Sequence, residues 1–141
     1  MRRLPHLALP VLVVLTMTAL LGCAGGPPAP STVPVAIVDF KTVAGKWSGL
    51  YSRDTTSSSR EDWVNLAINE DGTFEFGSFR QVGALHGKGK LTLRDGKLYG
   101  QSDKGGTFVS SLFDRGGKPL LKVAAQDAAG MSYTAELSRG Q

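Results

Sequence analysis

Few residues of this chain have the types and spacing that catalysis or metal binding requires. Its 141 residues include one cysteine and two histidines, which excludes an internal disulfide and a four-ligand Cys/His metal site. His86 lies in a segment that alternates with lysines, away from any nucleophilic serine. The chain contains no Gly-x-Ser-x-Gly motif. We therefore expect no enzymatic activity, no cofactor and no metal.

The cysteine has the setting of an export signal. Arg2 and Arg3 precede an uncharged apolar run from Leu7 to Leu21, which is followed by Gly22 and Cys23. As a helix this run would be about 22 Å long, shorter than a bilayer core of about 30 Å. The segment resembles the lipobox signal of bacterial lipoproteins, which implies cleavage after Gly22 and acylation of the Cys23 sulfur and amino group. A plain secretion signal, with Cys23 incidental, is the alternative.

The same resemblance implies a location in the cell envelope. Ala24 follows the cysteine where an aspartate would favour the inner membrane, so we expect a lipid anchor in the outer membrane, facing the periplasm. Residues 24–39 hold four prolines and no charge before Asp39, which is typical of an extended spacer. We expect three parts, namely a signal peptide at 1–22, a lipidated cysteine with its tether at 23–42, and a folded domain at 43–141.

The folded domain has the pattern of short strands joined by tight turns. Turn signals such as Asp71-Gly72 and Asp95-Gly96 recur about every 8 to 13 residues, and apolar and polar residues alternate between them. The pattern predicts eight strands, at residues 45–53, 62–70, 73–81, 85–94, 97–102, 106–113, 118–125 and 131–139. Because an open eight-stranded sheet would leave its edges unprotected, we expect an all-β, antiparallel up-and-down barrel.

Two local features have alternative interpretations. Phe74 and Phe76 share one parity and Phe79 has the other, so Gly77-Ser78 could form a β-bulge. The stretch from Pro119 to Ala129 has a proline at its start and a glycine after its end, so it could form a short helix instead of a strand.

The first predicted strand carries a motif with a family resemblance. It reads Gly45-Lys46-Trp47-Ser48-Gly49, and the Gly-x-Trp in it resembles the signature of the calycin superfamily, which includes the lipocalins, fatty-acid-binding proteins and avidins. The resemblance implies that Trp47 closes one end of the barrel against a basic side chain from a late strand. Arg139 is the candidate for this partner.

The predicted inward face could hold a small apolar ligand. Large aromatics alternate there with small residues such as Gly87, Gly89 and Gly100, and an eight-stranded barrel can either be filled or keep room for one ligand. A ligand site would be a cavity of about 300 Å³ or more, whereas the alternative is a narrow barrel filled by aromatic rings. The candidate ligand-binding residues are Trp47, Tyr51, Phe74, Phe76, Phe108 and Tyr133.

The outward face carries a basic stripe that could contact a partner. Lys88, Lys90 and Arg94 lie on one side of a strand, where they could meet lipid headgroups or an envelope protein, or simply keep the sheet solvated. The Ser/Thr-rich loop from Asp54 to Glu61 could gate the barrel or serve as a connector. The net charge of +4 is too small and too scattered to predict nucleic-acid binding.

Overall fold

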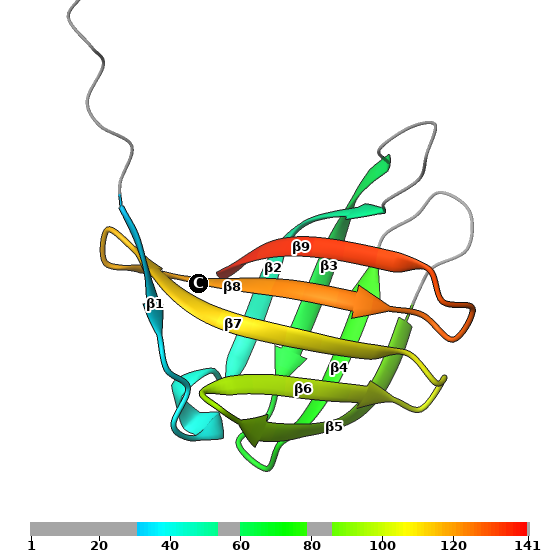
Figure 1. Ribbon diagram of the computed structural model, residues 1–141, viewed down its shortest axis with the longest axis horizontal. Coiled ribbons are helices and arrows are strands. Elements are labelled where there is room, and N and C mark those ends of the chain that lie inside the picture. The colour runs from blue at the N-terminus through cyan, green and yellow to red at the C-terminus, as the bar shows by residue number, and fades with distance from the viewer. Residues whose placement is uncertain (1–30, 54–59, 79–85, 141) are drawn as a thin grey trace, which may run out of the picture.

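The computed structural model describes residues 31–53, 60–78 and 86–140 of the chain (Figure 1). Most of this part is β-structure, in nine strands, and it also contains one short 3-10 helix. In chain order these elements are β1 (Thr32–Val35), η1 (Phe40–Thr42), β2 (Gly45–Arg53), β3 (Arg60–Ile68), β4 (Thr73–Ser78), β5 (His86–Arg94), β6 (Lys97–Ser102), β7 (Thr107–Arg115), β8 (Lys118–Gln126) and β9 (Ser132–Arg139).

Strands β2 to β9 form a closed antiparallel barrel. Each strand pairs with its neighbours in the chain, and β9 returns to pair with β2, so the meander closes on itself. The predicted eight-stranded up-and-down barrel is therefore confirmed. Its strands twist around a common interior, as Figure 1 shows. The segment that could have been a helix, from Pro119 onward, belongs to strand β8.

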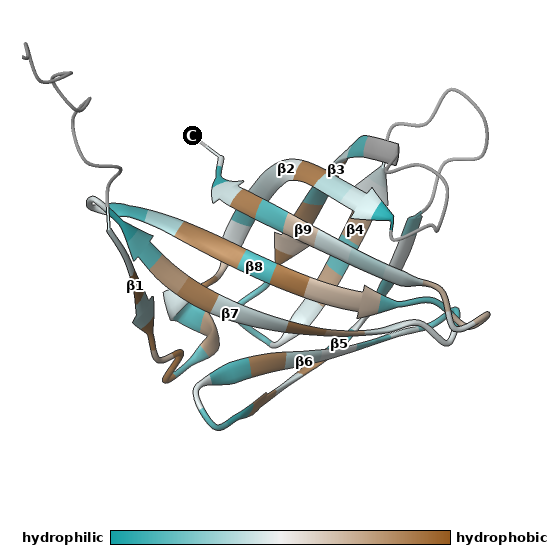
Figure 2. Cartoon of the chain, turned by 45° about the horizontal axis from the view of Figure 1, so that its top comes forward, coloured by the Kyte–Doolittle hydropathy of each residue, from teal (hydrophilic) through white to brown (hydrophobic). Residues whose placement is uncertain are grey.

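The local sequence explains why the strands form where they do. Hydrophobic and hydrophilic residues follow one another along β7, β8 and β9 (Figure 2), as expected for strands with one face inside and one outside. The two-residue turn between β5 and β6 consists of Asp95 and Gly96, with φ angles of 52° and 70°. A type I′ hairpin turn needs positive φ at both central positions, and Asp-Gly is among the dipeptides that tolerate this best.

Strand β1 and helix η1 add to the barrel a segment that the sequence analysis assigned to the tether. Strand β7 is longer than β6, and its pairing with β6 ends at Ser110 of β7. β1 pairs with the remaining residues on this edge of β7, from Leu112 to Arg115. This pairing covers backbone groups that would otherwise form an exposed edge. Ile37, which follows β1, is buried in the core and donates its N–H to the carbonyl of Gly96 at 3.0 Å. Thr32 to Thr42 thus packs as part of the folded domain.

One end of the barrel is closed around Trp47. Its side chain is only 1% exposed, and its indole N–H donates to the carbonyl of Val43 at 2.7 Å. The guanidinium of Arg139 lies over the Trp47 ring at 5.5 Å from its centroid and donates to the carbonyl of Ala44. The expected contact between Trp47 and Arg139 is therefore present, and the two residues are also register partners across β2 and β9.

Aromatic rings occupy the space that the inward glycines leave. Phe74, Phe76 and Phe108 are the register partners of Gly89, Gly87 and Gly100 respectively. In each pair, a Cβ atom added to the glycine would collide with the ring of its partner, at 2.6 Å in the case of Gly87 and Phe76. The half of the barrel next to Trp47 is filled, as one of the two alternatives predicted, because Trp47, Phe74 and Leu121 pack there with at most 1% of their surface exposed. Phe76 and Phe108 instead border the other half, which is not filled.

Replacing one of these glycines should destabilise the barrel. Gly100→Ala would place a methyl group 2.1–2.6 Å from three atoms of the Phe108 ring, so we expect a loss of about 1–3 kcal/mol in the free energy of unfolding. Urea denaturation of the full chain measures this loss. Gly77→Ala is the matched control, because no described residue lies within 4 Å of its added Cβ, and its effect should stay within about 0.5 kcal/mol. Equal effects of the two substitutions would contradict this account of the packing.

Candidate ligand-binding site

The unfilled half of the barrel contains a cavity of about 180 Å³. It opens between the β6–β7 turn at 103–106 and the β8–β9 turn at 127–131, and we call this end the mouth. Figure 1 shows both turns at one end of the barrel, with η1 at the other. The wall is mainly apolar, and its apolar side chains include Val64, Leu66, Phe76, Phe108, Val123 and Leu137.

The volume of the cavity limits what it can hold. It is smaller than the 300 Å³ expected from the sequence for a ligand site, but larger than an engineered apolar cavity of about 150 Å³ that binds benzene. The cavity can therefore take a group of about the size of one aromatic ring. A longer molecule would have to extend through the mouth.

Four of the six candidate ligand-binding residues meet in this cavity. Tyr51, Phe76, Phe108 and Tyr133 line it, and they come from four different strands. Trp47 and Phe74 do not line it, since they lie in the filled half with 1% and 0% of their surface exposed. Strand alternation fixes which side chains point inward, but it does not fix their height along the barrel axis.

The two tyrosines near the mouth are held by carboxylates. The Tyr51 and Tyr133 rings lie 5.9 Å apart between centroids and are tilted by 57°. The Tyr51 hydroxyl donates to Asp62 Oδ2 at 3.2 Å, and the Tyr133 hydroxyl donates to Asp127 Oδ2 at 3.0 Å. These bonds fix the rings in one orientation against the cavity.

Asp127 also organises the turn beside the mouth. Its Oδ1 accepts the backbone N–H groups of Ala129 and Met131, each at 2.9 Å. The Met131 N–H is the largest cause that lowers the pKa of Asp127 below its usual value, and the Tyr133 hydroxyl and the Ala129 N–H add to it. Ionised Asp127 therefore holds both the turn and Tyr133 in place.

The cavity wall contains a buried hydroxyl with no partner. Ser78 is 5% exposed and lines the cavity, and within the described parts of the chain its Oγ makes no hydrogen bond. Ser78 was not among the residues predicted to point inward, and the sequence left open a β-bulge at Gly77-Ser78. β4 instead pairs regularly with β3, with Gly77 opposite Asn65 and Ser78 opposite Val64. The alternation that begins at Phe74 and Phe76 therefore continues and would have placed Ser78 inward.

Two small residues of the cavity wall were also absent from the six candidate ligand-binding residues. Ala125 on β8 and Ala135 on β9 line the cavity, and their short side chains leave the space that larger ones would fill. Period-two alternation places Ala125 on the same face as Leu121 and Val123, which is the signal that could have identified it.

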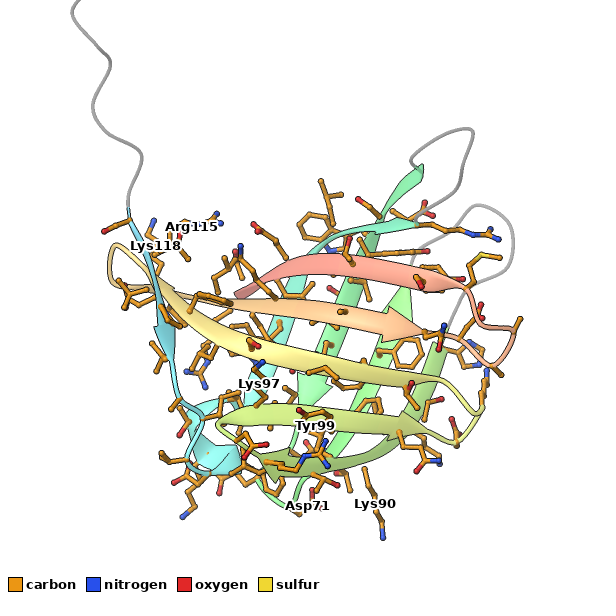
Figure 3. All side chains as sticks on the ribbon, viewed as in Figure 1. Asp71, Lys90, Lys97, Tyr99, Arg115 and Lys118 are labelled. Carbon is orange, nitrogen blue, oxygen red and sulfur yellow. The ribbon has the colours of Figure 1, made fainter. Side chains whose placement is uncertain are left out.

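The outward basic stripe lies on β5, as expected. Lys88, Lys90 and Arg94 are all exposed, and Lys90 extends away from the barrel beside Asp71 (Figure 3). Arg94 stacks on Tyr99 at 4.3 Å and forms an ion pair with Asp95 at 3.9 Å. At least one member of the stripe is thus engaged by its own sheet, and exposed pairs of this kind contribute little to stability.

Several predictions fall outside the described residues. These are the signal peptide at 1–22, Cys23 and the tether as far as residue 30, and the loop from Asp54 to Glu61 apart from its last two residues. Residues 79–81 and 85 of the predicted strands, Phe79 included, also lie outside the described parts. Among the residues that are described, no helix is long and apolar enough to cross a bilayer. The same residues include no group of three or more His, Cys, Asp or Glu side chains placed to hold a metal ion.

The barrel and its Trp47–Arg139 contact are consistent with a calycin-like domain. Comparisons with protein-family models, with curated proteins and with solved structures found no match to this chain. Its function has to be inferred from its own residues and geometry.

The stability of the barrel should depend on the charge of Asp127 at low pH. Folding lowers the pKa of this carboxyl, so ionised Asp127 contributes stability above the unfolded value near 3.8, and this contribution disappears as the pH falls through the lower folded value. Asp127→Asn should therefore reduce the free energy of unfolding at neutral pH and flatten its decline at acidic pH. Urea denaturation at neutral pH and at about pH 3 measures both.

Asp95→Asn at the exposed β5–β6 turn serves as the control substitution. The other carboxyls with lowered pKa values, Asp39, Asp71 and Glu136, remain in both variants, so the comparison isolates Asp127. An unchanged pH dependence in Asp127→Asn would contradict the assigned role of this carboxylate.

Proposed function

We propose that this protein is a lipid-anchored protein of the bacterial cell envelope whose barrel binds a small apolar ligand. The observation that carries the proposal is the apolar cavity at the mouth end, lined by Tyr51, Phe76, Phe108 and Tyr133. Ligand pockets are mainly apolar concavities with a few placed polar groups, and the Ser78 and Tyr hydroxyls provide such groups here. The ligand, or the part of it that enters, is about the size of one aromatic ring.

Ligand binding is favoured over a role for the basic stripe as an interaction surface. Arg94 is engaged by Tyr99 and Asp95, whereas the cavity is an open volume next to side chains that are already fixed in place. Apolar burial in a preformed cavity needs little rearrangement of the protein, so more of the interaction energy is available for affinity.

The point at which the chain enters the barrel is consistent with a mouth that faces away from the membrane. β1 pairs with the last residues of β7, so the chain enters the barrel beside Arg115 and Lys118, at the end away from the mouth (Figure 3). A lipid anchor at Cys23 would hold the barrel by this end. The mouth would then face away from the membrane, and the ligand would enter from the aqueous side.

Filling the cavity should abolish ligand binding. In the full chain reconstituted in lipid nanodiscs, toluene should cause saturable shifts in the methyl NMR signals of Val64, Leu66 and Val123, which line the cavity. Ala125→Phe places a ring in the cavity and should weaken this binding at least about tenfold, a loss of about 1.4 kcal/mol or more.

Ala124→Phe provides the matched control, because Ala124 is the exposed neighbour of Ala125 on the same strand and should leave toluene binding unchanged. Empty nanodiscs give the partition of toluene into lipid. The proposal of ligand binding fails if wild-type protein shows no saturable shift, or if both variants bind toluene equally well.

Lipid anchoring should require the thiol of Cys23. Cys23→Ser removes the sulfur that would carry the diacylglyceryl group, so radiolabelled palmitate should no longer enter the protein and its mass should lack the acyl chains. Labelling in a bacterial host followed by mass spectrometry makes both measurements, with Ser31→Ala in the spacer as a control that keeps the label. Palmitate incorporation into Cys23→Ser would refute this part of the proposal.

A further inference from the structure

We infer that the cavity selects an uncharged aromatic ligand with one hydrogen-bonding substituent, as in a phenol, and that Ser78 Oγ recognises this substituent. The inference rests on the proposed function, because it names the chemical class of ligand for the same cavity. It concerns a polar group that neither the fold nor the interactions of the described residues account for.

The first observation is the state of the Ser78 hydroxyl. Ser78 follows Phe76 on the inward face of β4 and is 5% exposed, and within the described residues its Oγ has no hydrogen-bond partner. Buried polar groups in proteins nearly always have a partner, and one without a partner calls for an explanation. A serine at a position lined by Val64 and Phe76 is explained if a bound molecule supplies the missing bond.

The second observation is that Asp127, Ser102 and Tyr51, which also line the cavity, form hydrogen bonds within the protein. Asp127 accepts three hydrogen bonds from its own turn and from Tyr133. Ser102 Oγ accepts the N–H of Lys104 at 3.0 Å, and the Tyr51 hydroxyl donates to Asp62. These bonds serve the fold, whereas Ser78 Oγ is a buried atom of the cavity wall that has no hydrogen-bond partner in the described parts of the chain.

The charges around the cavity favour a neutral ligand. Asp127 is committed to the turn, and Lys104 and His86 are exposed at the mouth, where water screens them. Arg53 Nε is also buried without a partner in the described chain, but Arg53 does not line the cavity, and its charge acts on Asp127. A charged group moved into this apolar interior would lose its hydration with no opposite charge to compensate.

The third observation is the aromatic character of the wall. Phe76, Phe108, Tyr51 and Tyr133 surround a volume slightly larger than one known to hold benzene. Aromatic rings pack well against a flat ring in edge-to-face or offset geometry, as Phe74 and Phe108 already do at 4.9 Å and 86°. One ring with one hydroxyl matches the shape of the cavity and the Ser78 Oγ, which has no hydrogen-bond partner among the described residues.

Ser110 provides a natural control within the same barrel. It too points inward, is 0% exposed and has an Oγ without a partner among the described residues. It does not line the cavity, and it is paired in register with Leu98 and Val123. The two serines therefore share chemistry and burial and differ in their access to the ligand.

The test compares phenol with toluene, which have the same shape and number of heavy atoms, in the full chain held in nanodiscs. Binding is followed by the methyl NMR signals of Val64, Leu66 and Val123. Ser78→Ala should weaken phenol binding about tenfold, as expected for the loss of one hydrogen bond in a buried site, and should leave toluene binding equal or tighter. Ser110→Ala should leave the ratio of the two affinities unchanged. Because each comparison is made within one ligand, partition into lipid cancels.

Ser78→Cys gives a second variant that keeps the side-chain shape and replaces the hydroxyl by a weaker hydrogen-bonding group. It should weaken phenol binding by an intermediate factor. If toluene binds but phenol responds equally to Ser78→Ala and Ser110→Ala, the inference about Ser78 is overturned and the proposed function stands. If neither probe binds the wild-type protein, the proposed function itself fails.

Discussion

The pairing of β9 with β2 is the interaction on which the rest of the structure depends. It joins the last strand to the first strand of the meander over seven register pairs, from Trp47↔Arg139 to Arg53↔Tyr133. This closure removes the two edges of the sheet and separates an interior from an exterior. It also requires a close approach of the backbones at Gly49, where a Cβ atom would collide with the carbonyl of Glu136.

The pairing of β2 with β9 creates a different side-chain contact at each of its two ends. At one end it places Arg139 over Trp47 and next to the carbonyl of Ala44, which seals the filled half. At the other end it places Tyr133 against Tyr51, whose rings form part of the cavity wall. The packed end and the open end thus follow from one register.

The cavity arises from an uneven distribution of side-chain size around the barrel. The Phe76 and Phe108 rings extend across glycines on neighbouring strands, whereas β8 and β9 contribute the small side chains of Ala125 and Ala135, and Ala125 is the register partner of Phe108. The small residues on that side leave a volume that the rings do not reach. The hydrogen bonds of Asp127 fix the adjacent turn, so this polar group at the mouth stabilises the rim, while the wall of the cavity is mainly apolar.

The sequence by itself determined the strands, their turns and the side of the barrel on which each residue lies. The predicted bounds of β2 and β6 agree with the structure, and the Asp95-Gly96 turn has the expected geometry, because alternation and turn conformation are local properties of the chain. Only the tertiary structure decided that β1 completes the edge of β7, that Trp47 and Phe74 lie in the filled half, and that Ser78 Oγ has no hydrogen-bond partner among the described residues. These features depend on the register between strands. Period-two alternation fixes which side chains point inward, but a shift of two residues along the barrel axis keeps the same side chains inward, so alternation does not fix their height.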